Sequence, residues 1–141
     1  MSIYAESSAV LAWLLGEADG EGARQALANA DRVVASDLTL VECDRVLIRA
    51  QVTHEVPEVR IAALRARLNA AAAHWTLVWV DGDVVDRARR PFPGEPIRTL
   101  DALHLASALA ARAALERLDL LSLDQRIRSS ALRLGFTVLP A

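Results

Sequence analysis

The fold is decided by residues 2–16, SIYAESSAVLAWLLG, in which a strand pattern passes directly into a helix pattern. The run at 2–5, SIYA, is short and apolar with a β-branched and an aromatic residue, which is typical of a buried strand. The run from Ser7 to Leu15 has the length of a helix, and Gly16 is a residue that commonly follows a helix end. Only Glu6 separates the two, so we expect a strand followed at once by a helix.

The same alternation continues along the chain. Further strands are expected at Arg32–Ser36, Trp75–Val80, Leu118–Leu123 and Phe136–Leu139. Helices are expected at about Asp19–Asn29, from a cap at Ser36 or Asp37 through Leu47, from Pro57 to about Ala73, at Asp83–Arg90, from a cap at Thr99 to about Leu115, and at Gln125–Leu134. Five strands separated by helices predict an α/β fold, a mostly parallel sheet flanked by helices.

Length and composition favour one domain over residues 1–141. The chain is 53% apolar and 24% charged, as soluble globular proteins are. No apolar run approaches the roughly 20 residues of a membrane span, and no secretory pattern follows Met1, so a cytoplasmic protein is expected. The single cysteine, Cys43, excludes an internal disulfide and a thiol-redox pair, and we expect it to be buried.

Charge narrows the classes of function. The net charge of -2 argues against a broad basic face for duplex DNA. All 16 basic residues are arginine, so no catalytic lysine is possible. This counts against response-regulator receivers and haloacid-dehalogenase-type phosphatases, which normally use one and also carry an acid pair after the first strand. Glycine-rich nucleotide-binding motifs are absent as well.

A parallel sheet places its ligand site beyond the carboxyl ends of the strands, and three of four candidate acids fall there or just beyond. Glu6 follows the first strand, Glu42 lies about one turn into the helix after the second strand, and Asp124 follows the fourth strand. The fourth acid, Asp101, opens the helix after the proline-rich loop. Each has an ordinary alternative explanation as a helix cap, a partner of the helix dipole or a solvated residue. Apolar neighbours of Glu6 and Glu42 make a lone charge there costly.

A bound cation would offset the free-energy cost of placing these charged carboxylates among apolar residues. Carboxylates without a histidine pair suit hard cations such as Mg²⁺ or Mn²⁺, whereas zinc favours histidine and cysteine. A cation held in this way can generate hydroxide from water and stabilise charge on a phosphate oxygen. The sequence therefore predicts metal-dependent hydrolysis of a phosphodiester.

The chain resembles the PIN-domain ribonucleases, and among them the VapC-type toxins of bacterial toxin–antitoxin pairs. The resemblance is carried, in family order, by IYAESSAVLAWLLGE, LTLVECDRVLIRA, RTLDALHLASAL and LLSLDQRIRSSALRLGF. It implies the strand order 3-2-1-4-5, dependence on Mg²⁺ or Mn²⁺, cleavage of structured RNA such as transfer or ribosomal RNA, and inhibition by a small antitoxin. By position, Glu6, Glu42, Asp101 and Asp124 match the four acids of the family, and Ser8 and Ser122 match its small hydroxyl residues.

One position departs from the family, which usually has aspartate where this chain has Glu6. The extra methylene displaces the carboxylate by about 1.5 Å. We expect a working site with an altered metal preference, since Mg²⁺ tolerates little geometric error. The alternative is a catalytically silent PIN-like module that binds RNA or protein.

Supporting residues surround these acids. Arg45 and Arg49 share the helix face of Glu42, and Arg98 precedes the Asp101 helix, so all three are candidates for RNA phosphate contacts, with a solvated helix face as the alternative for the first two. His104 is expected to be a structural histidine that donates a hydrogen bond rather than a metal ligand.

A partner surface is a second expectation. The run AVLAWLL, which contains Trp13 and Leu14, is more apolar than one face of a surface helix requires. Core packing explains most of this run. An exposed part would suit a groove for a partner's helix or a homodimer contact.

Overall fold

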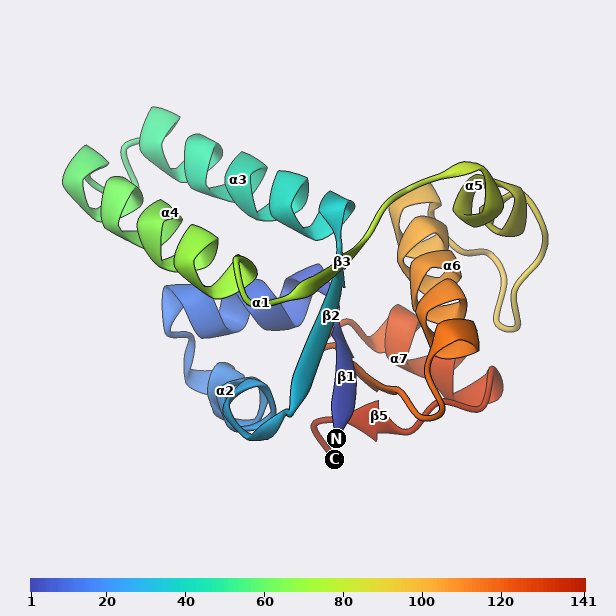
Figure 1. Ribbon diagram of the computed structural model, residues 1–141. Coiled ribbons are helices and arrows are strands. Elements are labelled where there is room, and N and C mark those ends of the chain that lie inside the picture. Colours follow the sequence, from blue (N-terminus) through green and yellow to red (C-terminus); the bar gives the residue numbers. More distant parts are fainter.

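A parallel five-stranded sheet divides the molecule (Figure 1). The computed structural model describes all 141 residues, and the strand order is β3-β2-β1-β4-β5, which confirms the expected topology. All four strand pairs are parallel. The strands are β1 (Ser2–Ala5), β2 (Arg32–Ser36), β3 (Thr76–Val78), β4 (Asp119–Leu121) and β5 (Val138–Leu139).

Helices cover both faces of this sheet. In Figure 1 the strands are seen edge-on, with α1 to α4 on one side and α5 to α7 on the other. Both termini lie at the edge where β1 begins. The helices are α1 (Ser7–Leu15), the 3₁₀ turn η1 (Ala18–Gly20), α2 (Glu21–Asn29), α3 (Asp37–Val52), α4 (Glu58–Ala72), α5 (Gly82–Ala88), α6 (Thr99–Ala114) and α7 (Gln125–Arg133).

Each face has its own core because successive strand residues point to opposite sides. On β1, Tyr4 packs with Leu105 and Ile127 on the side of α6 and α7. Ala5 packs with residues of α1, α3 and α4 on the other side, Cys43 among them. The expectation of a buried cysteine is confirmed, and burial raises the pKa of the Cys43 thiol to about 12.

Some element ends differ from the sequence-based expectation. The helix of α6 begins at Thr99, with Arg98 rather than Thr99 at the cap position. Pro57 is likewise the cap of α4, and β3 is limited to Thr76–Val78 because its ladder pairs only with β2. These shifts leave every expected strand and helix in place.

The expectation that Leu14 forms part of a partner surface is wrong. Its side chain is fully buried against α3 and α4, because α1 is covered by these helices as well as by α2. Trp13 is only partly buried, and the guanidinium of Arg67 lies 4.7 Å from its ring centroid. None of the helices is both long and apolar enough to cross a membrane.

Candidate functional site

The four predicted acids lie at the carboxyl edge of the sheet, where β1, β2 and β4 end. Glu6 follows β1, Asp124 precedes α7, Glu42 lies in the second turn of α3, and Asp101 lies in the first turn of α6. Figure 1 shows α3 and α6 starting at this same edge. Glu6 is 5% exposed and the other three are partly buried, so none of them is a simple surface charge.

Two serine hydroxyls fix one oxygen of Glu6. Ser122 donates to Glu6 Oε2 at 2.7 Å, and Ser8 donates to the same oxygen. The hydroxyl oxygen of Ser122 accepts the backbone N–H of Asp124 at 3.1 Å, and that of Ser8 accepts the N–H of Leu123 at 2.9 Å. Because the N–H groups occupy the hydroxyl oxygens, the hydroxyl hydrogens are free to point at Glu6. The two serines therefore hold Glu6 as a hydrogen-bond acceptor tied to the turn after β4.

Ser122→Ala is expected to lower the free energy of unfolding by about 1–2 kcal/mol, since it removes a fully buried hydroxyl that both donates and accepts. Urea unfolding measures this. Ser129→Ala is the matched control, because Ser129 is exposed and its hydroxyl has no partner. Equal unfolding midpoints for the two variants would contradict the role given to Ser122.

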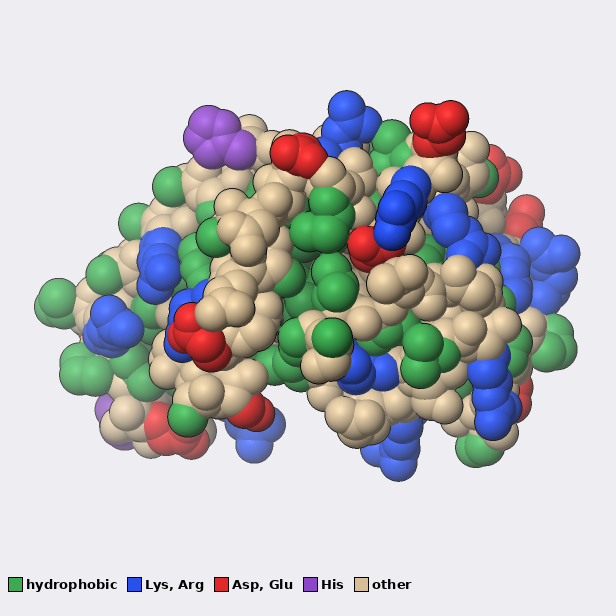
Figure 2. All heavy atoms as spheres, turned by 90° about the horizontal axis from the view of Figure 1, so that it is seen from below, with side chains coloured by type: hydrophobic (Ala, Val, Ile, Leu, Met, Phe, Trp, Pro, Cys, Tyr) green, Lys and Arg blue, Asp and Glu red, His purple; other side chains and the backbone are tan.

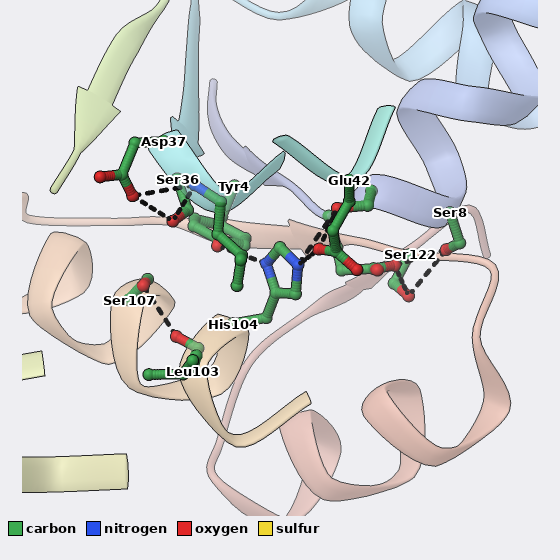
Figure 3. A network of polar contacts seen from close by, with 12 residues as sticks. Tyr4, Ser8, Ser36, Asp37, Glu42, Leu103, His104, Ser107 and Ser122 are labelled. Atoms are coloured by element: carbon green, nitrogen blue, oxygen red, sulfur yellow. Dashed lines mark hydrogen bonds and ion pairs between the residues drawn. The ribbon is translucent and has the colours of Figure 1, made fainter. Parts of the chain in front are cut away.

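Glu42 is held by a buried histidine (Figure 3). His104 Nε2 contacts Glu42 Oε1, and Nδ1 lies 2.9 Å from the Tyr4 hydroxyl. Ser7 also donates to Glu42 Oε1, at 2.7 Å. Burial by itself raises the pKa of Glu42, but the hydrogen bond and charge of His104, with the bond from Ser7, hold it below the usual range. The expectation of a structural, hydrogen-bonding histidine is confirmed.

Asp101 has the opposite environment. Burial and then the neighbouring carboxylates of Asp124 and Glu6 raise its pKa, only partly opposed by His104 and Arg98. Asp124 is the cap of α7, since its Oδ1 accepts the N–H groups of Arg126 at 2.9 Å and Ile127 at 3.1 Å. Asp101, Glu6 and Asp124 are thus close enough to repel one another.

The oxygens left over at this edge are suitable donors for a hard cation. Glu6, Glu42 and Asp124 each use one carboxylate oxygen in hydrogen bonds within the protein and leave the other unbonded, while Asp101 leaves both unbonded. No three acidic, histidine or cysteine side chains converge into a ready-made metal cluster. Mg²⁺ does not require one, because it usually keeps several waters and takes only one or two carboxylates. The donor set fits such an ion.

Of the three predicted arginines, only Arg98 lines a cavity shared with the acids. Arg98 lines a cavity of about 300 Å³ together with Asp101 and Asp124. Arg45 and Arg49 are exposed on α3, and their side chains have no partner there. The remaining lining residues of the cavity, Gln125 and Arg126, were missed from the sequence, although their position directly after Asp124 at a helix start was the available signal.

Ser7 and Tyr4 were also missed as partners of this site. Tyr4 lies in a strand and Ser7 in an apolar helix run, so their patterns indicate packing alone. Their contacts with Glu42 and His104 span 35 and 100 residues of sequence, respectively. No local motif carries that information.

Comparison with known proteins finds one matching family and a similar ribonuclease. The model of the PIN domain family matches residues 3–133. Ribonuclease VapC46 of Mycobacterium tuberculosis (strain ATCC 25618 / H37Rv) is 34% identical over 138 residues, which cover 98% of this chain and 96% of that protein. This relative is similar over nearly its whole length.

Solved structures share the fold at lower sequence identity. A toxin–antitoxin complex from Klebsiella pneumoniae has a TM-score of 0.68 at 18% identity, covering 100% of this chain and 98% of that one. Mycobacterium tuberculosis VapC20, described as a toxin that cleaves the sarcin-ricin loop, has a TM-score of 0.66 at 17% identity, covering 96% of each chain. VapBC2 from Rickettsia felis, bound to a promoter DNA fragment, has a TM-score of 0.65 at 9% identity, covering 98% of this chain and 97% of that one.

Proposed function

The chain belongs to the PIN-domain family, and within it to the VapC-type ribonucleases, and from this premise we propose that it is an endoribonuclease that uses Mg²⁺ or Mn²⁺. Glu6, Glu42, Asp101 and Asp124 form its catalytic site. The observation that carries the proposal is that these four acids, from separate elements, lie at one edge of the sheet with carboxylate oxygens free of internal hydrogen bonds. Burial, and after it the carboxylates of Asp124 and Glu6, raise the pKa of Asp101, and His104 and Arg98 oppose this only in part. A divalent ion relieves the repulsion between these carboxylates.

The residues divide the work at this site. Asp101 and Asp124 face the shared cavity and would hold the cation, with Glu6 and Glu42 completing the set of oxygen donors. When bound, a divalent cation supplies a Lewis acid for the phosphate and lowers the pKa of water. His104 and Ser7 orient Glu42, while Ser8 and Ser122 orient Glu6. Arg98 lies where it can hold a phosphate oxygen.

The relatives support a proposal for the substrate and the partner. One structural neighbour is described as cleaving the sarcin-ricin loop, and another is a toxin–antitoxin complex. We propose structured RNA, transfer or ribosomal, as the substrate and a small antitoxin as the partner of a homodimer. Trp13, together with Leu27 and Trp75, lines an apolar groove of about 220 Å³ that is the candidate partner surface.

The second candidate function is a catalytically silent module that binds RNA or protein. Glu6 is the observation that favours it, because the longer side chain is already bound at Oε2 by two hydroxyls. The same two bonds leave Oε1 available, which supports the active alternative. Activity therefore has to be measured with the chain itself.

The test is cleavage of total RNA by the purified chain, freed of any partner, in Mg²⁺, Mn²⁺ or EDTA. We expect discrete products with at least one of the two ions and none in EDTA, since removing the cation leaves the carboxylates without a Lewis acid. Equal cleavage in all three conditions would refute metal dependence. RNA binding without cleavage in any of them would establish the silent module.

A further inference from the structure

A groove continues from the acidic site along α7. Its cavity of about 630 Å³ lies between the 94–98 loop and the first turns of α7, and it is lined by Gly94, Pro96, Ile97, Arg98, Gln125, Arg126, Ser129 and Ser130. Three of these residues, Arg98, Gln125 and Arg126, also line the smaller cavity that contains Asp101 and Asp124. The two cavities therefore form one path that begins at the carboxylates.

Two arginines at the junction have no partner within the protein. Arg98 and Arg126 are exposed, and neither makes a side-chain hydrogen bond or an ion pair, even though Asp101 and Asp124 line the same cavity. Arg128 on the same helix is different, because it donates to the carbonyls of Ser122, Leu139 and Pro140 and so has a structural role. Unpaired guanidinium groups beside a cavity are suited to bind phosphate.

The rest of the groove combines apolar surface with unbonded polar groups, as a site for a nucleoside requires. Pro96 and Ile97 present apolar surface on the loop side, while the amide of Gln125 and the hydroxyl of Ser129 are unbonded on the helix side. Ser130 is used differently, since it donates to the carbonyl of Pro93 at 2.8 Å and ties the loop to α7. The volume lies within the usual range of about 300–1,000 Å³ for small-molecule sites.

The segment from α5 to α7 is richer in arginine than the rest of the chain. Residues 82–133 contain nine arginines against seven acidic residues, although the whole chain is negative. Figure 2 views the molecule from below, from the edge where both termini lie and opposite the carboxylates, and on the half formed by α5, α6 and α7 it shows basic side chains with acidic ones among them.

We propose that this groove binds the nucleotide next to the scissile phosphate in an unpaired stretch of RNA. Arg98 and Arg126 hold the phosphate of that nucleotide, its sugar and base lie against Pro96 and Ile97, and Gln125 and Ser129 contact the base edge. The proposal rests on the proposed ribonuclease function and adds a substrate subsite to it. It makes Arg126 and Gln125 determinants of which RNA is bound.

The test measures binding without turnover. All proteins carry Asp101→Asn and are kept in EDTA, and a short end-labelled single-stranded RNA of mixed sequence is titrated by fluorescence anisotropy. Arg98→Ala/Arg126→Ala is compared with Arg32→Ala/Arg60→Ala, which changes the charge equally at two exposed arginines without partners outside the groove. Circular dichroism melting confirms that both pairs remain folded.

We expect the groove pair to bind RNA at least about tenfold more weakly than the parent, because two charge-assisted contacts are lost. The slope of log affinity against log salt should fall by about 0.7, the value for one neutralised phosphate in a single strand. The control pair should keep the affinity and slope of the parent. Gln125→Ala should keep the slope and change the relative affinity for different homopolymers.

An equal loss in both pairs, or no loss in either, overturns the groove proposal. Cleavage by the chain with native Asp101, measured in parallel, separates this result from failure of the proposed function. If that chain cleaves RNA and the groove pair binds like the parent, only the subsite is wrong. If the groove pair alone loses binding while no metal-dependent cleavage occurs, the subsite stands and the nuclease function falls.

Discussion

Asp101→Asn is expected to lower the rate of RNA cleavage by about a thousandfold, the size of effect seen when a group that stabilises transition-state charge is removed. Asn keeps the shape of the side chain and removes the charge. Asp101 is the acid whose two oxygens are both unbonded, so no internal hydrogen bond is lost. The assay is the initial rate on total RNA at saturating Mn²⁺.

Stability provides the control for this variant. The pKa of Asp101 is raised in the folded protein, so stability falls as the pH rises from the pKa of Asp in the unfolded chain to that raised pKa, and the whole penalty is present above it. We therefore expect Asp101→Asn to melt at a higher temperature than the parent at neutral pH, with the difference vanishing as the pH falls below the unfolded value of Asp. A lower Tm at neutral pH would mean that lost activity reflects damaged folding.

The matched catalytic control is Asp83→Asn. Asp83 also lies in the first turn of a helix, α5, but it is exposed and does not line the cavity that contains Asp101 and Asp124. It should cleave RNA like the parent. A comparable loss of rate in both variants would contradict a specific role for Asp101.

His104→Ala is expected to cost about 3 kcal/mol of the free energy of unfolding, the largest stability effect that we anticipate. His104 is 1% exposed and contacts Tyr4, Ser7 and Glu42, so the change opens a cavity and leaves buried polar groups without partners. Burial raises the pKa of Tyr4, which keeps the phenol protonated and in need of an acceptor. Urea unfolding gives the measurement.

Two comparisons make this prediction specific. His74→Ala changes an exposed histidine and should leave the unfolding midpoint unchanged. A double-mutant cycle with Glu42→Ala should show that the two changes are not additive, because each removes the contact between His104 and Glu42. Additive effects would show that His104 supports the fold without holding Glu42.

The sequence predicts the architecture well because its signals are local. The run from Ser2 to Gly16 becomes β1 and α1 at the predicted residues, and Gly16 has the left-handed φ of 67° that ends the helix. The order of the strands came only from the family resemblance, since periodicity does not tell which strands are neighbours. The edge strands β3 and β5 were predicted too long because apolar runs continue past their short ladders.

The candidate site was predicted as a set of acids but not as a network. Glu6, Glu42 and Asp124 could be located because each comes after a strand and parallel strands end at one edge, whereas Asp101 follows a loop and was paired with them by the family resemblance. The pKa of Glu42 is lowered while that of Asp101 is raised, and the difference comes largely from His104 and Ser7. Packing between α1, α3 and α6 brings these two residues to Glu42. Leu14 failed as a surface residue for the same reason, since the sequence did not show how fully α1 is covered.

The most direct measurement of the central claim is Mn²⁺ binding followed by electron paramagnetic resonance, in which the signal of free Mn²⁺ disappears on binding. The chain should bind Mn²⁺, and Asp101→Asn and Asp124→Asn should each weaken that binding by at least about tenfold, since each removes a charged ligand. Asp83→Asn should bind like the parent. Equal Mn²⁺ binding by all four proteins would contradict a cation site at these carboxylates.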